Sequence, residues 1–251
     1  MAPPMTNHVQ LDNVNHRDLR VRQVFSPGMG FDVNIARAFP SEFIYLQRDY
    51  PLFFMKNTET GFFEAVVMLG FDNDENLFLG DPQWSADYIP LSIQRHPFLI
   101  GMQQQEIDGM AREVPVVHID LDHPSVSRSE GEPLFLAQGG ESPYLERMTG
   151  VLKAIHEGYE ENRALSQVLV GLELIESVKV DVEFADGSGK SLTGLFKLNE
   201  ERFAALSGSA LETLNEAGQL HSVFMMLASL SSMPRLIERK NKRLAEAVNG
   251  G

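Results

Sequence analysis

Two histidines and two aspartates fall within six consecutive positions, from His118 to His123. In a strand, His118, Asp120 and Asp122 share one face, about 6–7 Å apart in steps. Imidazole and carboxylate groups are ligands for iron(II), manganese or zinc, so a divalent metal site is one interpretation. The other is a half-buried strand with one solvated face, because apolar residues alternate with the polar ones. We favour the solvated face and expect no cofactor, with a divalent metal as the alternative.

Two other segments resemble ligand-binding motifs but are incomplete. The segment DGSGKS, residues 186–191, ends like a phosphate-binding loop, but Phe184 stands where that loop needs a glycine. We therefore expect a hairpin tip there. The segment DNDENL, residues 72–77, begins like a calcium loop, but Leu77 replaces the required glycine and Gln83 the required glutamate. A solvated acidic turn is the better interpretation.

Two features are candidates for ligand or partner contact. Trp84 is the only tryptophan and lies in a loop rich in proline and aspartate, where it is either part of the core or a ligand platform. The last helix concentrates basic residues in an acidic protein. Such a cluster is either a solvated face that complements the helix dipole or a docking surface for an acidic partner or a second copy. The basic residues are Arg235, Arg239, Lys240, Lys242 and Arg243.

The elements that position these residues predict an α+β fold. An aromatic-rich antiparallel sheet is expected in a strand-rich half, residues 16–126, with a hairpin closed by Asn57–Gly61. A polar connector with several glycines then leads to a mostly helical half, residues 140–251, which contains one hairpin over 178–198. We expect the two halves to pack as one unit.

Local signals predict several element boundaries. Alternation over Asp18–Phe25 indicates a strand. Ser142 is the expected N-cap of a helix that begins at Pro143, and a second helix is expected around Ser166–Glu173. Ser209, followed three residues later by a glutamate, predicts another helix N-terminus.

Composition excludes several classes of protein. The 251 residues carry a net charge of −14, which repels nucleic acid and anionic membranes. The chain has no cysteine, so disulfides and thiol chemistry are excluded. Its first ten residues lack the pattern of a secretory signal, and the apolar stretch Val223–Met233 is too short to span a bilayer. We therefore expect a cytoplasmic protein without a membrane span.

The chain resembles the bacterial SapC family over roughly residues 6 to 244. The segments that carry the resemblance are TNHVQLDNVNHRDLRV, YPLFFMKNTETGFFEAVVMLGF, ENLFL, RHPFLIG, VHIDLD, GEPLFL, GGESPYLERM, NEERFAAL and LIERKNKR. The family takes its name from a gene associated with a bacterial surface layer. Relatives are often encoded beside flavin-dependent halogenase-like proteins, cupin-like proteins and TonB-dependent receptors. The resemblance implies an accessory protein in nutrient uptake or modification, and it supplies no catalytic residues.

These observations together predict a non-catalytic accessory or binding protein. Its contacts would be Trp84 and the basic last helix, and its partner another protein or a second copy of the chain. One alternative is a metal-dependent enzyme that uses His118, Asp120 and Asp122. Another is a surface-layer component.

Overall fold

The computed structural model describes residues 7–80, 82–107 and 110–249. The first part of the chain, where no secretory signal is expected, lies partly outside these residues. The strands are β1 His8–Gln10, β2 Arg20–Val21, β3 Ile35–Arg37, β4 Leu52–Lys56, β5 Phe63–Met68, β6 Phe98–Ile107, β7 Met110–Asp120, β8 Val126–Ser127, β9 Glu132–Pro133, β10 Ile175–Glu183 and β11 Gly189–Leu198. The helices are η1 Pro40–Glu42, α1 Phe43–Leu46, α2 Leu91–Gln94, α3 Pro143–Gly171, α4 Glu200–Ala204, α5 Gly208–Glu216, α6 Leu220–Ser229, η2 Leu230–Ser232 and α7 Met233–Asn249.

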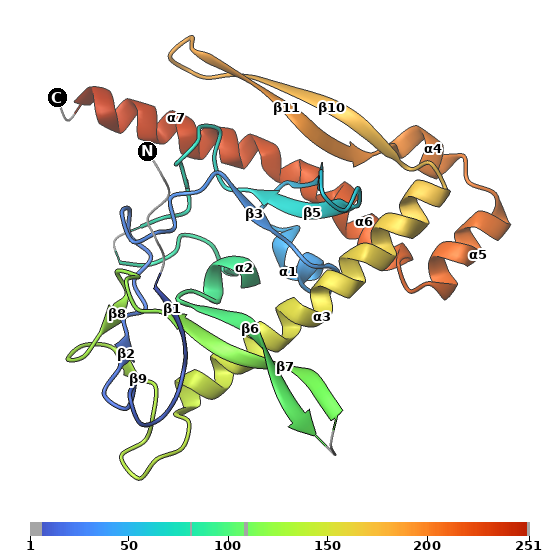
Figure 1. Ribbon diagram of the computed structural model, residues 1–251. Helices are drawn as coiled ribbons and strands as arrows, with labels where there is room; N and C mark the ends of the chain where they lie inside the picture. The colour runs from blue at the N-terminus through green and yellow to red at the C-terminus, as the bar shows by residue number, and fades with distance from the viewer. Residues whose placement is uncertain (1–6, 81, 108–109, 250–251) are drawn as a thin grey trace. The chain divides into compact units, whose positions relative to one another are not determined.

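The fold is α+β, as the sequence predicts. Antiparallel pairing joins all neighbouring strands of three sheets, and most helical residues lie in the second half of the chain. Figure 1 shows the two longest helices, α3 in yellow and α7 in red, and the paired strands of the β6–β7 and β10–β11 hairpins.

The chain forms two compact units that are discontinuous in sequence. Unit 1 contains residues 1–31, 79–84 and 91–156, and unit 2 contains residues 32–78, 85–90 and 157–251. Helix α3 begins in unit 1 and ends in unit 2. This division differs from the expected halves 16–126 and 140–251, and their packing as one unit stays a prediction.

Unit 1 holds two small sheets. One has the order β1-β7-β6 and the other β8-β2-β9. The strand predicted over Asp18–Phe25 is mostly wrong, because only Arg20–Val21 is a strand. Beyond it, the backbone N–H groups of Arg22 and Phe25 bond to Ser125 and Pro82 in loops, so the extended chain has no neighbouring strand to continue the ladder.

Unit 2 is built on a five-stranded sheet of order β10-β11-β4-β5-β3. The predicted β4–β5 hairpin is confirmed, and Gly61 closes it with a φ of 74° that favours glycine. The predicted hairpin over 178–198 is also confirmed, with strands that extend it back to Ile175. Phe53 and Phe54 on β4 are buried. Phe71 and Phe78 are buried as well, although they follow β5 rather than lie in a strand.

Helix α3 is a single helix of 29 residues. Ser142 caps it as predicted, since its hydroxyl accepts from the N–H of Leu145 at 3.2 Å. The separate helix predicted from Ser166 is wrong. The Ser166 hydroxyl is buried within α3 and accepts from the N–H of Phe63 at 2.9 Å, so it serves a tertiary contact rather than a new helix start. The helix ends at Gly171, two residues before Glu173 takes a positive φ.

One predicted helix N-terminus in the C-terminal part of the chain is also wrong. Ser207, not Ser209, caps α5, because its hydroxyl accepts from the N–H of Ala210. Further on, the stretch Leu220–Val248 is long and apolar enough in one window to cross a membrane by length and composition alone. The core helices of soluble proteins meet the same criterion, so the expectation of no membrane span stays a prediction.

Candidate docking site on helix α7

Helix α7 is amphipathic, with a buried side that faces unit 2. Leu236 is fully buried and Lys240 is buried four residues later, one turn along the same side. Lys242 and Glu238 lie on the exposed side. The helix therefore presents its basic residues in two directions, toward its own unit and toward solvent.

Three of the basic side chains hold loops of unit 2 in place. Arg239 donates to the hydroxyl and the carbonyl of Ser85, both at 2.7 Å, and its guanidinium lies 4.4 Å from the ring centroid of Phe78. Arg235 donates to the carbonyl of Arg48. Arg243 donates to the carbonyl of Asn76 at 3.1 Å. Much of the predicted basic cluster is thus engaged within the chain.

Lys240 forms the most buried of these contacts. Its ammonium lies 2.7 Å from carboxylate oxygens of both Asp72 and Glu75. Burial acts against its charged form, but the hydrogen bonds that Lys240 donates to the two carboxylates outweigh burial and raise the pKa of Lys240. Hydrogen bonds from Lys190 and Lys240 lower the pKa of Asp72. The acidic turn predicted at residues 72–77 is therefore an internal anchor for α7 and for the β10–β11 hairpin.

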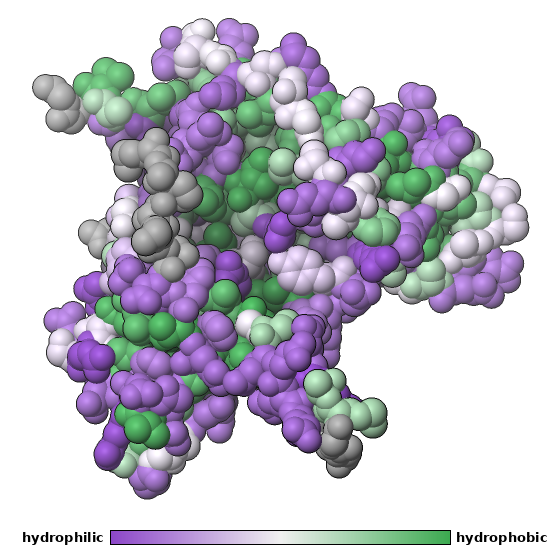
Figure 2. Space-filling model, in the orientation of Figure 1, coloured by the Kyte–Doolittle hydropathy of each residue, from purple (hydrophilic) through white to green (hydrophobic). Residues whose placement is uncertain are grey.

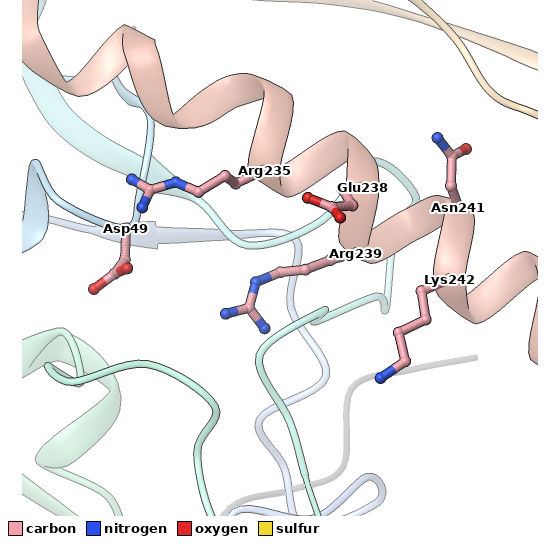
Figure 3. A pocket seen from close by; sticks show the side chains of 6 residues that line it. All are labelled: Asp49, Arg235, Glu238, Arg239, Asn241 and Lys242. Carbon is pink, nitrogen blue, oxygen red and sulfur yellow. The ribbon is translucent and has the colours of Figure 1, made fainter.

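A groove of about 700 Å³ runs along the exposed side of α7. Arg235, Arg239 and Lys242 follow one another at spacings of four and three residues, so they lie on one side of the helix. Figure 3 shows Arg239 and Lys242 extending to the same side and Arg235 reaching toward Asp49. The residues that line it all have polar or charged side chains and are Asp49, Arg235, Glu238, Arg239, Asn241 and Lys242.

The groove retains hydrogen-bonding capacity. Lys242 is 78% exposed, and its ammonium is 3.9 Å from Glu246, a distance at which a surface ion pair contributes little. Each guanidinium carries five N–H donors. Arg235 shows one donated bond and Arg239 two, so both can still bind a carboxylate in the fork geometry that suits arginine.

Comparison with known protein families gives one match. The SapC family model covers residues 11–236, which is most of the chain. The chain belongs to the SapC family. No curated protein and no solved structure matches it. The resemblance found in the sequence is thereby confirmed, and the functional properties that it implies remain proposals for this SapC-family protein.

Trp84, the other predicted contact residue of this SapC-family chain, is buried. Only 8% of it is exposed, and its ring meets Phe25 edge to face at 5.9 Å. This placement favours a role in the core of unit 1 over that of a ligand platform, because a platform must offer its ring face to the ligand.

The predicted metal ligands lie at the end of β7 and in the turn after it. His118 and Asp120 are both in the strand, but Asp122 is not. Asp120 accepts a hydrogen bond from the N–H of Asp122 at 3.1 Å, which is a local turn that ends the strand. Within residues 7–80, 82–107 and 110–249, no group of three or more His, Cys, Asp or Glu is arranged to hold a metal ion. The solvated face stays a prediction, and the divalent metal stays its alternative.

His118 has a structural contact that the sequence did not predict. A Cβ added to Gly101 on β6 would come within 2.6 Å of the His118 Nε2 atom. The imidazole therefore lies directly over the glycine of the neighbouring strand. This close approach explains why a residue without a side chain stands at position 101.

Two further histidine contacts in unit 1 are not predicted by the sequence. Strand β1 places His8 opposite Asp120, with its Nε2 3.8 Å from the carboxylate. The rings of His96 and His123 stack with centroids 5.5 Å apart. Burial lowers the pKa of His96 to about 3, with the charge of Arg95 as a further cause. No local pattern marks either contact, since both join residues distant in sequence.

Proposed function

We propose that this SapC-family protein is a non-catalytic binding protein that holds an acidic protein partner in the groove along α7. The observation that carries the proposal is the stripe of Arg235, Arg239 and Lys242 along a groove lined by polar and charged residues. Small-molecule sites are usually lined by apolar and aromatic side chains, whereas this lining suits carboxylates on a protein surface.

Charge supports the same class of partner. The chain has a net charge of −14, so an acidic partner is repelled by most of its surface and attracted at the stripe. The electric field of this charge distribution orients an approaching partner more than it adds to the binding affinity. Following the family resemblance, we place the partner among the proteins encoded beside SapC relatives, in nutrient uptake or modification.

The first experiment measures binding of a labelled oligoglutamate peptide to the full chain. We expect binding at about 0.02 M salt that weakens strongly at about 0.3 M, since the charges involved are exposed. Lys242→Glu should weaken binding about tenfold or more at low salt, because it reverses the charge of an exposed cation of the stripe. Lys179→Glu on β10 is the matched control, since Lys179 is also an exposed lysine with an acidic neighbour.

A second experiment uses natural candidate partners. Purified flavin-dependent halogenase-like and cupin-like proteins, of the kinds encoded beside SapC relatives, are mixed with the wild-type chain, Lys242→Glu and Lys179→Glu. Loss of complex formation only in Lys242→Glu supports binding of the partner in the groove. Equal peptide binding by both variants, or binding that ignores salt, contradicts the proposal.

A further inference from the structure

The β6–β7 hairpin extends well beyond the third strand of its sheet. Strand β1 pairs only with His118–Asp120, and the N–H of Leu11 adds one bond to the carbonyl of Val117. The ladder between β6 and β7 continues for the seven pairs from Gly101↔Val116 to Ile107↔Met110. Among the described residues, this outer part is a two-stranded ribbon, a form that is marginally stable alone in water.

Both faces of this ribbon are open to solvent. Met102 on β6 is 54% exposed and Met110 on β7 is 59% exposed. Gln104, Gln105 and Glu106 are exposed as well. In Figure 2, the visible side chains along this hairpin, labelled β6 and β7 in Figure 1, are largely hydrophilic with some hydrophobic residues among them. The ribbon thus offers exposed side chains on both of its faces.

The register of the hairpin shows which backbone groups of β6 point away from β7. Pro115 lies opposite Met102 and has no N–H to donate. The two residues therefore form a non-hydrogen-bonded pair of the ladder, in which the N–H and C=O groups of each residue point away from the other strand. Every second residue from Met102 shares this orientation. The N–H and C=O groups of Ile100, Met102, Gln104 and Glu106 therefore point outward, and β6 is the last strand of the sheet.

This outward edge lacks the features that usually protect an edge strand. Proteins block such edges with charged side chains, proline or bulges. Residues Leu99 to Gln105 include no ionisable side chain and no proline, in a chain with a net charge of −14. The other long edge strand, β10, carries Glu176, Lys179, Asp181 and Glu183. The contrast marks β6 as the edge on which another strand can add.

We propose that two copies of this chain pair through their β6 strands, antiparallel and related by a twofold axis near residues 102–104. A twofold contact sets the same edge against itself, so it must avoid like charges. In an antiparallel register centred on 102–104, Glu106 of one copy lies opposite a residue between Phe98 and Met102 of the other, never opposite Glu106. Glutamine side chains near the axis can bond across it.

The response to salt separates this contact from the α7 groove. Residues Leu99 to Gln105, at the centre of the contact, carry no charge, while the two copies repel each other through their net charge. Raising the salt concentration screens that repulsion, so the dimer should hold or strengthen. Partner binding in the groove should weaken under the same change. Failure of one proposal therefore leaves the other intact.

The main experiment measures the mass of the full chain by sedimentation over a range of concentrations. The wild type is expected at twice the chain mass of 28.1 kDa. Gln104→Pro removes one outward N–H from each copy and leaves the β6–β7 ladder intact, so the dimer dissociation constant should rise about tenfold or more. Gln104→Thr keeps the N–H and is the matched control, expected to remain dimeric.

A cross-linking experiment tests pairing through the β6 edge without the Gln104→Pro substitution. The chain has no cysteine, so a single introduced cysteine reports one contact. Gln103→Cys, near the proposed axis, should form a covalent dimer on mild oxidation. Ser188→Cys is the control, because Ser188 is exposed at the tip of the β10–β11 hairpin, outside the proposed contact. Only random encounters would cross-link it, so it should not form a covalent dimer. A monomer at every concentration and salt, or equal cross-linking of both variants, overturns the proposal.

Discussion

The ammonium of Lys240 lies 2.7 Å from the carboxylate of Glu75, and both side chains are only 11% exposed. The two residues stand 165 positions apart, on α7 and in the turn after β5. A buried ion pair of this kind fixes where the helix can sit, because either charge left alone would be costly to bury. The basic cluster of α7 therefore has a structural part and an exposed part.

Replacing Lys240 by methionine should destabilise the chain by about 3 kcal/mol, since it leaves Glu75 buried without its partner. Chemical denaturation with a two-state analysis measures the change. Lys242→Met is the control and should alter stability by less than about 0.5 kcal/mol, because Lys242 is exposed. Equal effects of the two substitutions would show that the pair does not hold α7.

The pH dependence of that difference follows from the shifted pKa values. The contribution of Lys240, whose pKa is raised, is complete below its ordinary value of 10.5 and lost as pH rises through the folded value. The contribution of Asp72, whose pKa is lowered, is complete above its ordinary value of 3.8 and lost as pH falls through the folded value. The wild type and Lys240→Met should therefore differ by a constant amount from about pH 5 to 9. Denaturation curves across this range provide the test.

Gly158 in α3 should not tolerate a larger side chain. An added Cβ would lie 2.6 Å from the ring of the fully buried Phe39, so Gly158→Ala should cost about 2 kcal/mol. Gly150→Ala in the same helix is the control. Apart from its chain neighbours and the backbone of its own helix, no atom of the described residues lies within 4 Å of its added Cβ, so it should stabilise the helix by about 0.5–1 kcal/mol. Thermal unfolding of both variants tests the contrast, and a shared direction of change would contradict it.

Acid should weaken unit 1 through His96. Its folded pKa of about 3 lies below the ordinary value of 6.5, so its contribution to stability is complete above 6.5 and is lost as pH falls toward 3. Between pH 7 and 5 this loss amounts to about 2 kcal/mol. His96→Phe, which cannot take up a proton, should lose less stability over that interval. Denaturant titrations at the two pH values provide the measurement, and parallel losses in both proteins would argue against this role.

Arg239→Lys should destabilise unit 2 although it keeps the charge. Lysine cannot reproduce the two hydrogen bonds to Ser85 together with the contact of the guanidinium over the Phe78 ring, so the expected cost is about 1–2 kcal/mol. The equivalent change Arg235→Lys loses only one bond, to the carbonyl of Arg48, and should cost less. Denaturation midpoints rank the two variants.

The parts of the fold that follow from local chemistry were predictable. The β4–β5 hairpin depends on a glycine at its turn, and the start of α3 depends on Ser142 as its cap. The end of β7 was not predictable from alternation alone, because Asp120 uses its carboxylate to turn the chain at Asp122. The continuity of α3 was missed because the Ser166 hydroxyl bonds to distant Phe63.

The candidate site was only partly predictable for the same reason. The basic residues of α7 are visible in the sequence, but their division into anchors and exposed groups depends on acceptors supplied by Arg48, Asn76 and Ser85. These acceptors are mostly backbone carbonyls, which no sequence pattern marks. His8 reached Asp120 through strand pairing across 112 positions, and that pairing has no local signal.

The pairing of β11 with β4 delays completion of the unit 2 sheet during synthesis of the chain. Leu195 pairs with Met55, so 140 residues (195 minus 55) separate the two strands. At the usual speed of a ribosome, roughly 10 s or more pass between the synthesis of β4 and that of its neighbour. During that time the edge of β4, with its phenylalanines, has no partner strand. Early folding assistance for the nascent chain therefore matters most around residues 52–68, before the C-terminal half has emerged.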